Sequence, residues 1–155
     1  MKRNPIRSST RKATAKLPSS ASIPTTQKSA ALSLAERVID ACAEANGRDI
    51  AVLNVTGIFA LADYFVVVSG KSDRQVQGIS NKVLDSLEHS GERALAVEGM
   101  DDGQWVLIDL GDVIVHVFYE PLRAHYDLES LWRRAKRLDV IRSEESGKLE
   151  LSNAA

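Results

Sequence analysis

The chain has 155 residues, of which 44% are hydrophobic, and a formal net charge of −1 at pH 7. This length and composition predict one globular domain, and the single cysteine, Cys42, excludes an internal disulfide and a zinc site built from cysteines. No apolar run reaches the roughly 18 residues of a membrane-spanning helix, so no such helix is predicted. We expect a cytoplasmic protein without membrane contact.

The charge is distributed unevenly along the chain. Residues 1–35 contain seven Lys and Arg and no acidic residue, which leaves 13 basic and 21 acidic residues in the remainder. Residues 1–30 also hold ten Ser and Thr and three of the four prolines, a composition that predicts a disordered basic tail. A cleaved organelle-targeting segment and a loose RNA contact by this tail stay open as alternatives. The acidic remainder argues against a domain whose main surface binds nucleic acid.

Residues 31–138 are predicted to form the domain. A helix is expected to begin at the capping box Ser33–Glu36, and Cys42 lies on its apolar stripe, where it fits a small core residue better than a nucleophile. Two segments rich in Val, Ile and aromatic residues, 49–56 and 63–70, then predict strands.

A second helix and a third strand follow. The helix is expected to begin at a further capping box, Ser72–Gln75, and to end at Gly91. Residues 93–99 predict the strand. A strand, a helix and a strand in this order favour a parallel crossover.

Residues 105–120 predict a β-hairpin around a Gly111-Asp112 turn. The pairing places side chains suited to a buried core on one face, and these are Val106, Ile108, Leu110, Val113, Val115, Val117 and Tyr119. The other face is amphipathic and consists of Trp105, Leu107, Asp109, Ile114, His116 and Phe118. This mixed face fits packing under a helix, a catalytic pocket or a contact with another protein.

A last helix is expected to begin at Asp127 and to continue to Leu138, because the apolar residues between them keep helical spacing. Four basic residues near its end are attributed to the helix dipole rather than to an RNA patch: Arg133, Arg134, Lys136 and Arg137. Residues 139–155 are predicted to be a flexible C-terminal tail. The whole predicts a single α/β domain, with a mixed sheet of about five strands and helices packed on it.

The sequence offers little for catalysis. The stretch SGKS at 69–72 is too short for a phosphate-binding loop, and no acidic pair is placed to hold a metal. His116 can approach Asp109 across the hairpin, and a structural hydrogen bond is the simpler explanation of that pair. We expect no metal and no cofactor, and a nucleotidyltransferase-like enzyme stays open as an alternative with little support from the residues.

The combination of motifs resembles the ribosomal silencing factor, or Iojap-like, family. The resemblance runs from about Ser33 to Ala135 and is carried, in order, by DYF, SGKSDRQ, VEG, WVLIDLGD, VHVF and YDLESLW. It implies a nucleotidyltransferase-like fold without enzyme activity. It also implies binding to the large ribosomal subunit through large-subunit ribosomal protein fourteen, which blocks small-subunit joining and represses translation. Organelle members act in large-subunit assembly, and isolated members often form homodimers.

The resemblance, together with the mixed hairpin face, suggests eight partner-binding residues: Trp105, Leu107, Asp109, His116, Phe118, Glu120, Tyr126 and Trp132. Trp105 and Phe118 are expected to be apolar anchors, and Asp109 and Glu120 to meet Lys or Arg of the partner. Trp132 also lies on the expected helix stripe, where a core role explains it more simply. Three further residues match the family motifs and are equally explained by caps and turns: Asp63, Ser69 and Gln75.

Overall fold

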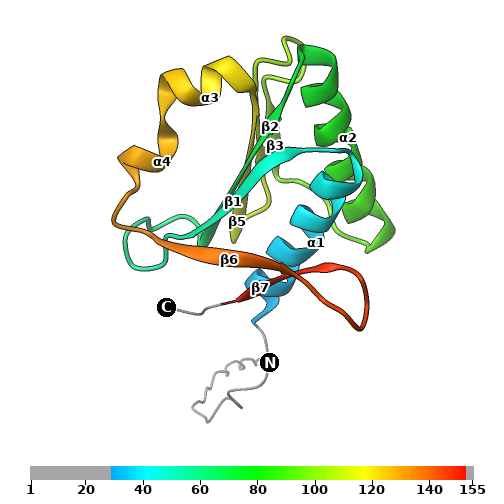
Figure 1. Cartoon of the computed structure of the whole chain (residues 1–155), viewed down its shortest axis with the longest axis vertical. Coiled ribbons are helices and arrows are strands. Elements are labelled where there is room, and N and C mark those ends of the chain that lie inside the picture. The colour runs from blue at the N-terminus through cyan, green and yellow to red at the C-terminus, as the bar shows by residue number, and fades with distance from the viewer. Residues whose placement is uncertain (1–28, 153–155) are drawn as a thin grey trace, which may run out of the picture.

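The computed structural model describes residues 29–152 (Figure 1). Within this range the elements are α1 (Ala30–Glu44), β1 (Arg48–Asn54), β2 (Tyr64–Gly70), α2 (Asp73–His89), β3 (Ala96–Glu98), β4 (Trp105–Asp109), β5 (Val113–Tyr119), α3 (Glu120–Tyr126), α4 (Leu128–Leu131), β6 (Lys136–Arg142) and β7 (Leu149–Ser152). The strands form one mixed sheet in the order β3-β4-β5-β2-β1-β6-β7. The predicted α/β domain is confirmed, with seven strands instead of about five.

Only one pair of neighbouring strands among the described residues is parallel, β2 with β5, and the other five pairs are antiparallel. Strand β3 therefore runs in the same direction as β2, although β5 and β4 lie between them. This confirms the parallel sense of the predicted crossover, in which α2 connects two strands that are not neighbours.

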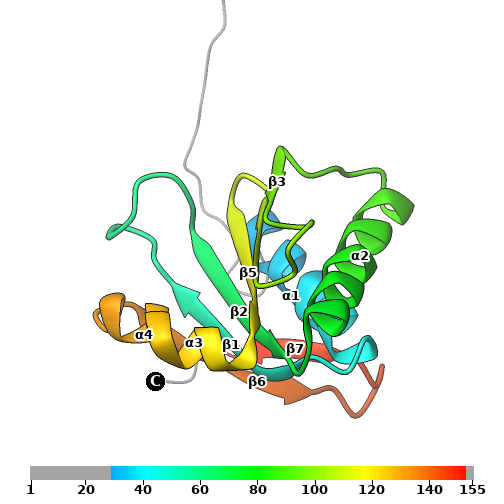
Figure 2. The ribbon, with the colours of Figure 1, turned by 90° about the horizontal axis from the view of Figure 1, so that it is seen from above.

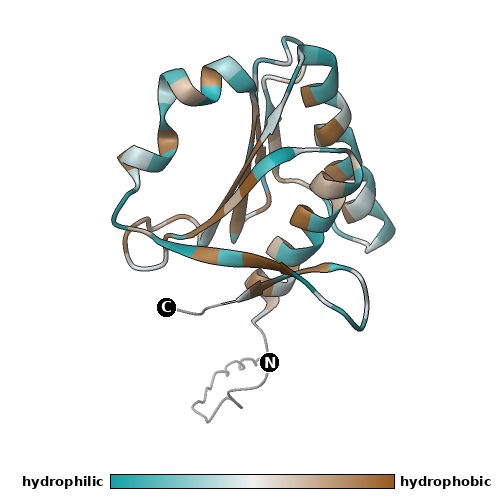
Figure 3. Ribbon diagram, in the orientation of Figure 1, coloured by the Kyte–Doolittle hydropathy of each residue, from teal (hydrophilic) through white to brown (hydrophobic). Residues whose placement is uncertain are grey.

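The long helices α1 and α2 cover one face of the sheet (Figures 1 and 2). Their apolar stripes, which include Ile39 and Ile79, pack on the aliphatic face of the central strands, including Val66, Ile108 and Val115. All five of these side chains are fully buried, and the central strands are correspondingly apolar in Figure 3. Cys42 belongs to the same cluster, and burial raises the pKa of its thiol to about 12, as expected of a core cysteine.

The two helix starts are specified by serine caps. Ser72 Oγ accepts a hydrogen bond from Gln75 N at 3.1 Å, which confirms the predicted start of α2. For α1 the predicted start is four residues late, because Ser29 is the cap and accepts from Leu32 N at 3.1 Å. Apart from Ser29 and Ala30, the predicted disordered tail of residues 1–30 lies outside the described residues.

The predicted hairpin is confirmed in turn and register. Leu110 N donates to Val113 O at 2.9 Å, and Ile108 pairs with Val115. Period-two alternation then separates the two faces as the sequence indicates.

The predicted helix from Asp127 to Leu138 is wrong. Asp127 adopts a left-handed conformation, with φ 48° and ψ 52°, which ends α3 and turns the chain into the single turn of α4. From Lys136 the chain is extended as β6, and Leu138 pairs with Val52 of β1. The helical spacing of the apolar residues is coincidental, since Leu138 reaches the core from a strand.

The predicted flexible tail over residues 139–155 is also wrong for the part that the structure describes. The end of β6 and all of β7 form a hairpin that packs beside α1. Two acidic side chains of α1 fix the edge of β7: Asp40 accepts from Leu149 N at 3.2 Å, and Glu36 accepts from Leu151 N at 2.8 Å. Side chains of the first helix thus take the place of a further strand.

Candidate functional site

The second face of the sheet carries α3 and α4 and lies opposite the α1–α2 layer (Figure 2). Its side chains include most of the aromatic residues of the described chain, and together with the two short helices we call it the aromatic face. Strands β1, β2, β4 and β5 contribute to it every second residue. The helices α3 and α4 cover only part of it, because they comprise seven and four residues.

One aromatic group centres on Trp105. Its ring lies 4.8 Å from the ring of Phe118, in a stacked arrangement, and 4.9 Å from the ring of Tyr126. Trp105 is half-buried, Phe118 is fully buried and Tyr126 is 52% exposed. The three rings therefore form a continuous row of contacts from the core to the solvent, with Tyr126 at the exposed end.

A second aromatic group closes the face beside the loop after β1. Phe59, Phe65 and Trp132 meet edge to face, with ring centroids 5.3 to 5.4 Å apart. Phe65 is buried, whereas Phe59 and Trp132 are half-buried. Trp132 is therefore largely a packing residue that holds the end of α4 on the sheet.

His116 lies between the two groups and is 5% exposed. Its Nδ1 accepts a hydrogen bond from Trp105 Nε1 at 3.2 Å, so its proton sits on Nε2, because an indole can only donate. Within the described chain Nε2 has no hydrogen-bond partner. Burial lowers the pKa of His116 to about 4, and the ring is neutral at pH 7. The predicted bond to Asp109 is wrong, since Asp109 Oδ1 instead accepts from Gly111 N in the turn, at 2.9 Å.

The eight predicted contact residues divide by burial. Phe118 and His116 are buried, so the expectation that Phe118 anchors a partner is wrong for the folded chain. The partly or fully accessible residues are Trp105, Leu107, Asp109, Glu120, Tyr126 and Trp132. Of these, Glu120 forms an exposed ion pair with Arg48 at 3.8 Å, away from the centre of the face. The open part of the aromatic face is therefore made by Trp105, Leu107 and Asp109 of β4 with Tyr126 of α3.

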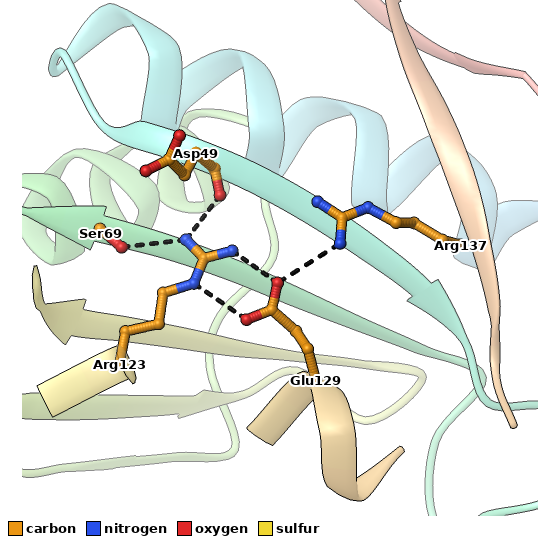
Figure 4. A network of polar contacts seen from close by, with 5 residues as sticks. All are labelled: Asp49, Ser69, Arg123, Glu129 and Arg137. Atoms are coloured by element: carbon orange, nitrogen blue, oxygen red, sulfur yellow. Dashed lines mark hydrogen bonds and ion pairs between the residues drawn. The ribbon is translucent and has the colours of Figure 1, made fainter. Parts of the chain in front are cut away.

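Two charged residues that sequence reasoning missed hold α3 and α4 in place (Figure 4). Arg123 donates to both carboxylate oxygens of Glu129, at 3.1 and 2.8 Å. Arg123 also donates to Asp49 O at 2.6 Å and to Ser69 Oγ at 2.9 Å, while Arg137 donates to Glu129 at 3.5 Å. The hydrogen bond from Arg123 lowers the pKa of Glu129, which keeps the pair ionised. Partners 54 and 74 positions away along the chain left no local signal of this network.

The network occupies the carboxyl ends of the parallel strands β2 and β5, where α/β folds commonly bind ligands. The adjoining hollow has a volume of about 260 Å³ and is lined by Ser69, Arg123 and Glu129, among others. These groups already satisfy one another. Ser69, one of the residues that match the family motifs, thereby has a structural role.

The remaining sequence motifs are accounted for by local structure. In SGKS the amide of Lys71 donates to Gln75 Oε1 at 2.6 Å, and the helix-start amide of Gln75 donates to Ser72. No group of three or more metal-ligating side chains occurs among residues 29–152. None of the helices described is both long enough and apolar enough to cross a membrane.

A groove of about 640 Å³ lies on the opposite side, between α1, α2 and the β6–β7 hairpin. Several of its charged residues are engaged with other side chains or with backbone. Lys82 pairs with Glu44 at 3.2 Å, and Arg37 pairs with Glu92 at 3.0 Å. We therefore take the aromatic face as the candidate functional site.

Comparison with known proteins shows the family to which the chain belongs. The family model described as "Ribosomal silencing factor during starvation" matches residues 27–154. The chain is 43% identical over 100 residues to "Ribosomal silencing factor RsfS" of Bacillus subtilis, covering 64% of this chain and 85% of that protein. It is 32% identical over 90 residues to "Mitochondrial assembly of ribosomal large subunit protein 1" of Mus musculus, covering 56% of this chain and 40% of that protein. A crystal structure of a Chromobacterium violaceum protein superposes with a TM-score of 0.64 at 36% identity, covering 65% of this chain and 84% of that one.

Proposed function

Because this chain belongs to the ribosomal silencing factor family, we propose that it binds the large ribosomal subunit and sterically blocks association with the small subunit. Translation is thereby repressed in the cytoplasm. The direct partner is large-subunit ribosomal protein fourteen. The observation that supports this most strongly is the partly covered aromatic face, where Trp105 is half-buried and Tyr126 is exposed.

The chemistry of the open part suits a basic ribosomal protein. Trp105, Leu107 and Tyr126 supply apolar and aromatic area of the kind that dominates binding energy at interfaces. Asp109 lies beside Leu107 on β4, and the exposed Glu98 of β3 pairs directly with Leu107. Carboxylates around an apolar centre fit a partner rich in Lys and Arg and speed its encounter.

The aromatic face is also prepared in advance for binding. The β4–β5 ladder fixes Trp105, and the Arg123–Glu129 pair fixes the short helices that carry Tyr126. A surface already held in its binding shape loses little conformational entropy on association. Steric exclusion needs such a rigid body and requires no bond to be made or broken.

We assign no catalytic step to the chain. At the carboxyl ends of β2 and β5, Arg123 is paired with Glu129, and the described residues contain no group of three or more side chains that could hold a metal ion. Phosphoryl or nucleotidyl transfer needs converging groups that are free to meet a substrate. Calorimetric titration with magnesium and nucleoside triphosphates should give no heat of binding.

Subunit joining tests the proposal. Purified large subunits are incubated with the full chain, small subunits are added, and the mixture is resolved on a sucrose gradient. The wild type should reduce the joined ribosome peak, and Tyr126→Ala should restore much of it. His89→Ala, which removes an exposed ring from α2 on the other side of the molecule, is the matched control and should behave as wild type. Normal joining with wild-type protein bound to the large subunit would refute the proposal.

A role in large-subunit assembly is the second candidate. It is supported by the similarity to the Mus musculus protein whose name refers to assembly of the ribosomal large subunit. Depleting this chain from its host would then cause immature large subunits to accumulate. Normal maturation during depletion would leave subunit blocking as the main role.

Homodimerisation of the free protein, which the family resemblance implies, belongs to the same proposal. Strand β3 is an edge of the sheet with all three residues exposed, and Leu95 beside it is 73% exposed. Exposed edges of this kind pair readily with another chain. Sedimentation of the wild type and of Val97→Lys, placed on that edge, tests whether a dimer forms there.

A further inference from the structure

The turn between α4 and β6 carries a concentration of positive charge on an otherwise acidic domain. Four of the five residues from Arg133 to Arg137 are basic, and the exception, Ala135, is buried. These four account for nearly a third of the 13 Lys and Arg in residues 36–155, where 21 residues are acidic. The sequence-based explanation for them, the dipole of a long C-terminal helix, does not apply, because no such helix forms.

Three of the four cations are available to a partner. Arg137 is engaged by Glu129, whereas Arg133, Arg134 and Lys136 are exposed and have no acidic partner among the described residues. Figure 3 shows this connection as a hydrophilic corner at the end of α4. We call these three residues the basic corner.

The backbone of the basic corner is fixed, in contrast to that of a solvated charge run. Ala135 N donates to Trp132 O at 2.9 Å, and Ala135 packs with Leu53 and Phe65 in a buried cluster. Lys136 begins β6 and pairs with Asn54 of β1. Cations held on a rigid backbone lose less freedom when they bind a surface of matching charge.

We infer that the basic corner binds backbone phosphates of ribosomal RNA beside the ribosomal protein seated on the aromatic face. This inference rests on the proposed function and adds a second partner to it. Residues 133–136 directly follow Trp132, whose ring packs at the edge of that face, so a subunit bound there also comes close to the corner. RNA is the main source of negative charge on a ribosomal subunit, and guanidinium groups match phosphate geometry.

The test compares salt dependence of binding. Affinity of the full chain for purified large subunits is measured over a series of potassium chloride concentrations. The variant Arg133→Ala/Arg134→Ala/Lys136→Ala should bind more weakly. The slope of log affinity against log salt concentration should become shallower by roughly 0.7 to 0.9 for each lost phosphate contact, which is a total change of about two for three contacts. Lys71→Ala/Arg74→Ala/Arg93→Ala removes the same charge from exposed sites elsewhere and should leave the slope unchanged.

Two further measurements separate the possible outcomes. A charge-keeping variant, Arg133→Lys/Arg134→Lys, should retain most of the slope, and thermal unfolding of all variants should match the wild type because the side chains are exposed. Binding to isolated ribosomal protein fourteen should be the same for the wild type and the basic-corner triple variant. A loss in that assay would assign the cations to a protein contact and overturn the RNA inference.

An unchanged slope in the basic-corner variant, or equal changes in both triple variants, would also overturn the inference while leaving subunit binding intact. Failure of the wild type to bind large subunits would overturn the proposed function itself. The two failures are therefore distinguishable in one experiment.

Discussion

The two faces of the β4–β5 hairpin are built from alternate residues of the same strands and have different roles. On one face, Val106, Ile108 and Val115 are fully buried beneath two long helices. On the other face, Trp105 and Leu107 are only half-buried, because α3 and α4 are short and cover only part of that face. The difference indicates that the first face supplies most of the stability. The second face buries less apolar area and leaves a surface accessible to a partner.

The sharpest test of this comparison uses neighbouring residues of β4. Ile108→Ala should lower the free energy of unfolding by about 2 to 5 kcal/mol, because it leaves a cavity in a fully packed core. Leu107→Ala, one position away on the aromatic face, should cost about 1 kcal/mol and weaken large-subunit binding instead. Urea denaturation and subunit pelleting of both variants check this. Equal losses of stability would mean that the two faces do not differ as described.

The ion pair that holds the second face offers the next largest effect. Arg123→Ala should lower stability by about 2 to 3 kcal/mol, since the carboxylate of Glu129 loses its bidentate partner. Hydrogen exchange should increase mainly in α3 and α4. Arg74→Ala, an exposed arginine of α2, is the control. If protection were lost evenly over the sheet instead, Arg123 would be supporting the whole fold and not this face.

Acid should destabilise the aromatic face through His116. Burial lowers the pKa of His116 from 6.5 to about 4, so below pH 6.5 the unfolded chain takes up a proton that the folded chain does not. The contribution of His116 to the free energy of unfolding is fully present above pH 6.5 and is lost as the pH falls toward 4, a change of about 3 kcal/mol. Unfolding measured at several pH values, with His116→Phe as the control, should show a flatter dependence in the variant over this window.

The smallest effect is expected from the hydrogen bond between Trp105 and His116. Trp105→Phe keeps most of the ring contact but leaves His116 Nδ1 without its donor, at a cost of about 1 kcal/mol. Adding His116→Phe should recover most of this loss, because both polar partners are then replaced by apolar rings. Additive losses in the double-mutant cycle would show that the bond contributes nothing.

Sequence reasoning succeeded where the signals are local. The Gly111-Asp112 turn and period-two alternation fix the hairpin register, and the Ser72 cap fixes the start of α2. Period-two alternation also places Trp105, Leu107 and Asp109 together on the second face, where all three are partly accessible. Their role in binding stays a prediction.

Sequence reasoning failed where distant segments decide the structure. The spacing of Leu128, Leu131 and Leu138 fits a helix, but the pairing of β6 with β1 and the left-handed Asp127 override it. Without the true positions of α3 and α4, the burial of Phe118 could not be foreseen. Arg123 was missed because its partners Asp49 and Ser69 come from strands far away in the sequence.

The placement of β1 between β2 and β6 has a kinetic consequence. The β1–β6 ladder joins Val52 to Leu138, and contacts between such distant positions form slowly because a long loop must close first. We therefore expect the helical layer and the central strands to assemble early and the β6–β7 hairpin to dock in a later, slower phase. Since β6 begins within the basic corner, that corner acquires its final geometry only when the docking is complete.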